Sequence, residues 1–96
     1  MKIVMIAYSQ AIDNEVTDIL VDNNVAGCTK WKEVTGEGVA GGVHLGTKRW
    51  PKLNNVLMMA LEDALAVKVM DGVRALRAQL GPEGVKAFML PCEEVT

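Results

Sequence analysis

The sequence predicts a single α+β domain in which the elements follow the order β-α-β-β-α-β. Four short apolar, β-branched runs are typical of strands. Two other segments carry apolar residues at helical spacing. The chain has 96 residues, the length of one domain, and would bury about 64% of its surface on folding, which is enough for one small core.

The first half of the chain predicts a strand, a helix and a second strand. Residues 2–8 are short, β-branched and apolar, as in a buried strand. Ser9 or Asp13 is expected to cap the helix that follows, which ends near Asn23. Residues 27–34 then predict the second strand. The apolar residues of the helix are Ile12, Val16, Ile19 and Leu20.

The second half predicts a strand, a longer helix and a last strand. Residues 56–61 are apolar and uncharged, and residues 85–90 precede an acidic tail. The Glu62-Asp63 pair is expected to cap the helix between these strands. Gly81 is expected to end the helix in a left-handed conformation. The proline after it cannot continue a helix. The apolar residues of this helix are Leu65, Val69, Val73, Leu76 and Leu80.

This order of elements is the split βαβ, ferredoxin-like pattern. It predicts a four-stranded antiparallel sheet with two helices on one face. Residues 1–96 are interpreted as one domain, with a long glycine-rich loop at about residues 36–52.

The predicted strands are apolar on both faces. Side chains alternate along a strand, and in residues 56–61 both alternating sets are apolar. Two helices cover only one face, so polar residues are expected on the other. The sequence therefore predicts oligomerisation through the open face, and the alternative is that the loop or the tail covers it. The two sets are Val56, Met58 and Ala60, and Leu57, Met59 and Leu61.

The glycine-rich loop is the strongest candidate for a functional segment. Glycines at positions 36, 38, 41, 42 and 46 let backbone N–H groups approach an anion closely. Lys48, Arg49 and Lys52 follow, with Trp50 among them, as in an anion clamp or a partner-docking tip. The alternatives are a hairpin connection without a ligand and a solvated run of charges.

A second glycine turn precedes the last strand. Gly84 can expose backbone N–H groups, and Lys86 can reach a phosphate as a point charge. The alternative is a plain helix stop. His44 is the one histidine, so a metal site needs help from Cys28, a carboxylate or a second subunit; the alternative is a loop histidine without a role. No nucleophile–base arrangement is assignable.

The composition excludes several classes of protein. The net charge of −2 argues against binding to a nucleic-acid duplex. The apolar runs are too short to span a bilayer, and the N-terminus is interpreted as a strand and not as a signal peptide. Cys28 and Cys92 form no C-x-x-C motif, which favours reduced thiols and a cytoplasmic location.

Four segments match, in order and spacing, the motifs of a known family. Residues 19–29 look like its helix end and the G-[MC]-T that opens its second strand, and residues 32–38 look like its S-E-V-K-G-x-G. Trp50-Pro51-Lys52 looks like its L-P-K, and residues 84–94 look like its closing G-x-G-K-I-F-V-x-P-V-E-D. The chain thus resembles, over nearly its whole length, the PII-like signalling proteins related to nitrogen-regulatory PII.

This resemblance implies a homotrimer of ferredoxin-like subunits with the sheets inside. It also implies small-ligand sites in the clefts between subunits, commonly for adenine nucleotides. The loop would be the family's T-loop, which contacts partner proteins such as a membrane transporter or an enzyme. It is shorter here and holds no tyrosine. The implied ligand-binding residues are Thr29, Gly36, Gly38, Gly84 and Lys86, and the implied partner-contact residues are His44, Lys48, Arg49 and Trp50.

The expected function is therefore that of a non-enzymatic, trimeric sensor or regulator. A ligand would order the glycine loop and change which partner it binds. The family's C-terminal arginine pair has no counterpart up to Thr96, so AMP, ADP, ATP or another small anion stays open as the ligand. A CutA-like metal-binding trimer using His44 and Cys28 is the first alternative, and a small enzyme on the same fold is the second.

Overall fold

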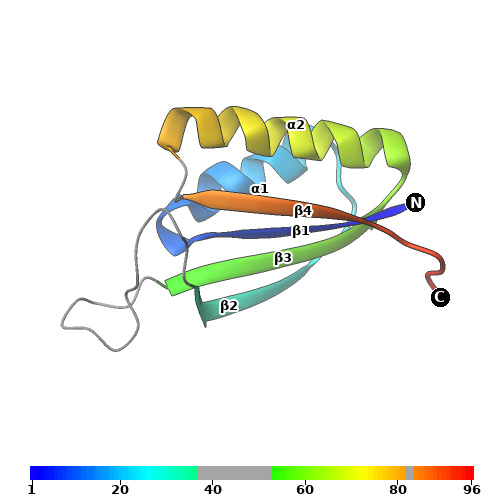
Figure 1. Cartoon of the computed structure of the whole chain (residues 1–96), viewed down its shortest axis with the longest axis horizontal. Helices are drawn as coiled ribbons and strands as arrows, with labels where there is room; N and C mark the ends of the chain where they lie inside the picture. The colour runs from blue at the N-terminus through cyan, green and yellow to red at the C-terminus, as the bar shows by residue number, and fades with distance from the viewer. Residues whose placement is uncertain (37–52, 82–83) are drawn as a thin grey trace.

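The structure is a computed structural model that describes residues 1–36, 53–81 and 84–96. A four-stranded antiparallel sheet forms one layer, and two helices form a second layer on one of its faces (Figure 1). This is the ferredoxin-like α+β sandwich that the sequence predicts. The strand order is β2-β3-β1-β4. In chain order the elements are β1 (Lys2–Ser9), the 3-10 turn η1 (Gln10–Ile12), α1 (Asp13–Asp22), β2 (Thr29–Thr35), β3 (Leu53–Leu61), α2 (Asp63–Leu80) and β4 (Val85–Pro91).

Two strand boundaries differ from the prediction. β2 begins at Thr29, two residues later than expected, and β3 begins at Leu53, three residues earlier. The early residues of β3 include Asn54 and Asn55, and asparagine is depleted in strands. They are in a strand here because they pair with the last residues of β1.

The helix caps also differ from the prediction. Ser9 Oγ accepts from Ala11 N at 3.3 Å and caps η1, whereas Asp13 lies inside the first turn of α1 and does not cap it. No side-chain bond caps α2 at Glu62. Gly81 has the expected positive φ of 88°, but its ψ of 178° lies outside the left-handed helical region.

The hydrophobic core lies between the helices and one face of the sheet. Alternate residues of β1 and β3 point into it, because side chains alternate along a strand. Helical spacing turns one stripe of each helix toward the same core. Its buried residues are Val4, Ile6, Tyr8, Val16, Leu20, Leu57, Met59, Leu61, Ala66, Val69, Val73 and Val85.

The other face of the sheet is apolar and has no covering layer in the described part of the chain (Figure 1). Met58 of β3 lies opposite Met5 of β1, which lies opposite Phe88 of β4. Trp31 and Phe88 are 44% and 48% exposed. We call this surface the open face; its apolar residues are Ile3, Met5, Ala7, Trp31, Val56, Met58, Ala60, Phe88 and Leu90.

The two chain ends lie close to each other at one end of the sheet (Figure 1). The N-terminal ammonium forms an ion pair with Asp63 at 2.8 Å, and Cys92 N donates to Met1 O at 3.2 Å. Within residues 1–36, 53–81 and 84–96, no helix combines the length and the apolar character needed to cross a membrane.

Candidate functional site

Two of the residues predicted to bind a ligand, Gly36 and Gly84, lie at the same end of the sheet. Ser9 pairs with Asn54 of β3, and Ser9 N donates to Gly84 O at 3.0 Å. Gly36 follows β2, and a Cβ at this position would lie 2.5 Å from Asn54 Nδ2. A side chain at position 36 would therefore require the Asn54 amide to move. The sheet end thus runs from Gly36 through Asn54 and Ser9 to Gly84.

Thr29 and Lys86 lie at opposite edges of the sheet. Thr29 is in edge strand β2, opposite Met58, and Lys86 is in edge strand β4, opposite Ala7. Three strand spacings separate the two edges, which is about 14 Å. One copy of the chain therefore does not bring these two predicted ligand residues together.

The Lys86 side chain projects from the open face and is exposed. Its ammonium lies 5.6 Å from the centroid of the Phe88 ring, two residues along the same strand. A cation over an aromatic face at an exposed position is weakly held, on the order of 0.5–1 kcal/mol. The Lys86 ammonium is therefore available to an anion at small cost.

The remaining predicted site residues divide into two groups. Cys28 is an exposed free thiol just before β2. In the described ranges no three His, Cys, Asp or Glu side chains gather as a metal site would require, so these ranges give the metal-binding alternative no support. The others lie outside the described residues: Gly38, His44, Lys48, Arg49 and Trp50.

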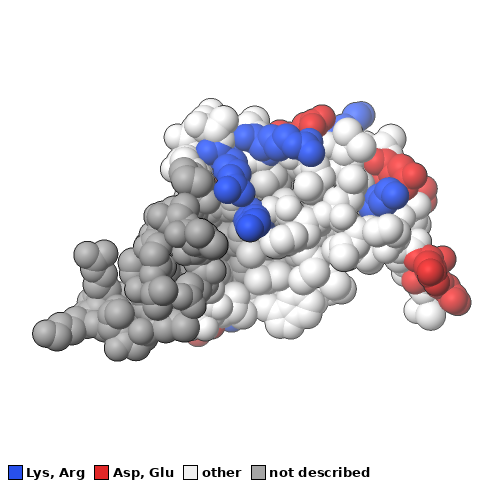
Figure 2. All heavy atoms as spheres, viewed as in Figure 1, with Lys and Arg blue, Asp and Glu red and all other residues white. Residues whose placement is uncertain are grey.

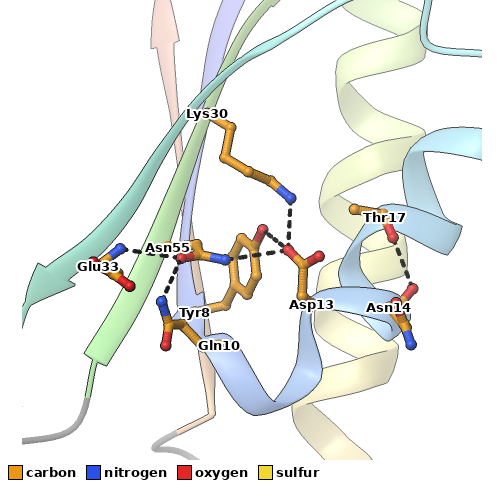
Figure 3. Close-up of polar contacts among 8 residues, drawn as sticks. All are labelled: Tyr8, Gln10, Asp13, Asn14, Thr17, Lys30, Glu33 and Asn55. Atoms are coloured by element: carbon orange, nitrogen blue, oxygen red, sulfur yellow. Dashed lines mark hydrogen bonds and ion pairs between the residues drawn. The ribbon is translucent and has the colours of Figure 1, made fainter.

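A polar cluster that the sequence did not predict lies between the start of α1 and the helix-facing side of the sheet (Figure 3). Asp13 Oδ1 accepts three hydrogen bonds at its centre. Tyr8 OH donates at 2.5 Å, Lys30 Nζ at 2.8 Å and Asn55 Nδ2 at 3.3 Å. These donors come from β1, β2 and β3, so a single carboxylate oxygen ties three strands to the first turn of α1.

Asn55 connects this cluster to the strand that leads into the glycine loop. Its side chain is 5% exposed, and its Oδ1 accepts from Gln10 Nε2 and from Glu33 N, both at 3.3 Å. Glu33 has a φ of 58° and lies where the β2–β3 register shifts between Trp31 and Val34. Asn55 therefore satisfies the backbone N–H of a bulge three residues before Gly36.

The ionisation of the cluster favours structure over acid–base chemistry. Hydrogen bonds from Lys30 and then Tyr8 lower the pKa of the Asp13 carboxyl. The bond to Asp13 raises the pKa of the Lys30 ammonium, and burial followed by the Asp13 bond raises that of the Tyr8 hydroxyl. Each group is thus held in its ordinary charge state near pH 7, whereas a general acid or base needs a pKa near the working pH.

The sequence held two indications of this cluster. An Asn-Asn pair directly before an apolar strand is unusual for a sheet, and Tyr8 at the end of a buried strand requires a partner for its hydroxyl. Neither signal names Asp13 or Lys30 as the partner, because those residues lie far from Asn55 in the sequence.

The cluster predicts acid-sensitive stability. Because the pKa of Asp13 is lower in the folded chain, its contribution is fully present above its unfolded pKa of about 4 and is lost as the pH falls through the folded value. Asp13→Asn should therefore flatten the fall in melting temperature between about pH 5 and pH 2. Part of the slope of melting temperature against pH should remain, because the N-terminal ammonium also lowers the pKa of Asp63. Asp22→Asn, an exposed carboxylate on α1, is the control, and an unchanged slope in Asp13→Asn would contradict the prediction.

The fold is similar to that of solved PII-like proteins. CPII from Thiomonas intermedia K12, bound to ADP, AMP and acetate, aligns with a TM-score of 0.71 at 18% identity, over 93% of this chain and 82% of that chain. The apo form of the same nitrogen regulatory PII-like protein aligns with a TM-score of 0.70 at 16% identity, over 92% of this chain and 84% of that chain. A candidate PII-like signalling protein from Thermus thermophilus aligns with a TM-score of 0.66 at 16% identity, over 92% of this chain and 81% of that chain. No protein-family model and no curated protein matches the sequence.

Proposed function

We propose that this chain is a divergent PII-like regulator, which binds an adenine nucleotide between subunits and acts on a partner protein through its glycine-rich loop. The observation that carries this proposal is the shared fold over 93% of the chain with a PII-like protein bound to ADP and AMP. The sequence motifs support the same assignment independently, because they follow the family's order along the chain.

The proposed assembly is a homotrimer with the open faces inside. Large exposed apolar patches on a soluble domain mark association surfaces. The position of the ligand residues supports the same arrangement. Thr29 and Lys86 lie on opposite edges of one sheet, so a ligand that touches both is held between the β2 edge of one copy and the β4 edge of the next.

The proposed activity is binding and not catalysis. The described polar cluster keeps its carboxylate charged and its tyrosine neutral near pH 7, which suits a structural role. The protein is proposed to act in the cytoplasm on a partner protein, such as a membrane transporter or an enzyme. Ligand binding at Gly36, where β2 ends, would change the conformation of the loop that contacts this partner.

Binding of adenine nucleotides tests the proposal directly. AMP, ADP and ATP should each be added to the full chain, with and without bicarbonate, because a ligand that binds only the native state raises the melting temperature. A concentration-dependent shift with at least one nucleotide is expected. The absence of any shift with all three at millimolar concentration, confirmed by calorimetry, would overturn the proposal.

Lys86→Ala tests the proposed phosphate contact. Loss of a hydrogen bond to a charged group should weaken nucleotide binding by roughly 1.5–3 kcal/mol. Stability without ligand should change by less than about 0.5 kcal/mol, because Lys86 is exposed. Isothermal titration of both proteins measures the first effect, and thermal unfolding measures the second. Lys68→Ala, an exposed lysine on α2, is the charge-matched control, and unchanged affinity in Lys86→Ala would remove Lys86 from the site.

A further inference from the structure

Basic side chains gather over the end of α2 and the start of β4 (Figure 2). Two arginines one turn apart on α2, Arg74 and Arg77, face different surroundings. Arg74 Nη1 lies 2.7 Å from Asp71 Oδ1 in an exposed ion pair. Arg77 Nη1 instead donates to the backbone carbonyl of Val85, the first residue of β4, at 3.4 Å.

Arg77 is positioned at the strand but is only weakly bonded there. Arg77 is half-buried, whereas Arg74 is exposed. The bond to Val85 O is longer than the 2.7–3.2 Å typical of N–H···O bonds. A guanidinium has five N–H donors in a planar fork, so most of the hydrogen-bonding capacity of Arg77 is not used by this carbonyl.

A second cation follows directly in the chain. Lys86 is the residue after Val85, it is exposed, and its ammonium rests on the face of the Phe88 ring. That contact is weak at an exposed position, so the long side chain can turn toward the edge of β4. The guanidinium of Arg77 lies at Val85 on the helix side of β4, and Lys86, the next residue, projects from the open face, so the exposed edge of β4 lies between the two cations.

We propose that Arg77 and Lys86 together bind two adjacent phosphate groups, and that Arg77 makes the site prefer a diphosphate to a monophosphate. This rests on the proposed function, in which the glycine turn before β4 binds the phosphates of an adenine nucleotide. Lys86 binds one phosphate as a point charge, and the planar fork of Arg77 binds the next bidentately. A monophosphate occupies Lys86 alone and is not affected by Arg77.

Calorimetric titration with ADP, AMP and inorganic pyrophosphate tests this proposal on the full chain. The unchanged protein should bind ADP at least tenfold more tightly than AMP. Arg77→Gln should lower the affinity for ADP and for pyrophosphate by about tenfold to a hundredfold, which is the range that corresponds to the loss of a charge-assisted hydrogen bond. The affinity of the same variant for AMP should fall less than about threefold. Arg77→Lys should restore part of the loss, because it keeps the charge without the fork.

Arg74→Gln is the matched control. It removes the same charge from the same helix, but Arg74 is engaged by Asp71. All three affinities should change less than about threefold. Equal losses in Arg74→Gln and Arg77→Gln would assign the effect to general electrostatics and overturn the proposal. An unchanged ratio of ADP affinity to AMP affinity in Arg77→Gln would also overturn the proposal. If Arg77→Gln does not fold, the same ratio measured in Arg77→Lys decides.

The outcomes also separate this inference from the proposed function. Binding of ADP and AMP without dependence on Arg77 would leave the proposed function intact and overturn the role of Arg77. Binding of pyrophosphate that depends on Arg77, without binding of either nucleotide, would support the diphosphate clamp and overturn the proposed nucleotide site. No binding of any of the three would overturn both.

Discussion

Met58→Asp is expected to separate the proposed homotrimer into monomers. Met58 lies near the middle of the open face, between Met5 of β1 and Thr29 of β2. A carboxylate placed there in a closed assembly would be buried without a partner, which costs roughly 3–5 kcal/mol. That corresponds to a loss of about two to four orders of magnitude in affinity between subunits. Sedimentation velocity at micromolar concentration should give a trimer for the unchanged protein and a monomer for the variant.

Two further variants control for unfolding. Val21→Asp introduces the same kind of charge on α1, where the side chain is 71% exposed, and should leave the trimer intact. Met59→Asp places the carboxylate on the opposite face of β3, where the side chain is 3% exposed under the helices, and should unfold the subunit. A monomeric unchanged protein at tens of micromolar, or a trimeric Met58→Asp, would contradict assembly through the open face.

Asn55→Asp is expected to destabilise the subunit by about 3 kcal/mol at pH 7, although the two side chains have the same size. One oxygen of the new carboxylate can still accept the hydrogen bonds from Gln10 and from the backbone N–H of Glu33. The second oxygen replaces the donor that now lies 3.3 Å from Asp13 Oδ1, so an attractive contact becomes a repulsion between two carboxylates. Chemical unfolding at one fixed protein concentration measures the loss, because assembly makes stability depend on concentration.

The pH dependence identifies the cause of this loss. Below about pH 4 either carboxyl becomes protonated and can donate to the other, so the difference between Asn55→Asp and the unchanged protein should shrink. Asn54→Asp is the matched control, because it makes the same change on the other face of β3, away from Asp13. A deficit that is independent of pH, or equal in both variants, would show that repulsion from Asp13 is not responsible.

The alternation of the sheet could be predicted because it depends on local patterns. Met58 and Met59 are adjacent, and period-2 geometry places them on opposite faces in any strand. The sequence therefore predicted that both faces of β3 are apolar. In the structure Leu57, Met59 and Leu61 are buried under the helices, whereas Val56 and Met58 on the open face are half-buried and Ala60 is exposed. Which set faces the helices was not predictable, because a shift of one residue in register would exchange the two faces.

Two of the predicted ligand-binding residues lie at one end of the sheet, with Gly36 against Asn54 and Gly84 bonded to Ser9. Their role in binding a ligand stays a prediction. The separation of Thr29 from Lys86 was not predictable from spacing in the sequence. It follows from the strand order β2-β3-β1-β4, which puts the second and fourth strands on opposite edges.

The sequence by itself determined the order of the elements, the helical stripes and the presence of two apolar sheet faces. These features depend on backbone preferences and side-chain periodicity within single segments, and such effects act between residues close in the chain. Only the tertiary structure decided that Asp13 joins Tyr8, Lys30 and Asn55, and that Arg77 reaches the first residue of β4. Polar groups withdrawn from water must find donors and acceptors wherever packing places them, and those partners come from segments that meet only when the chain folds.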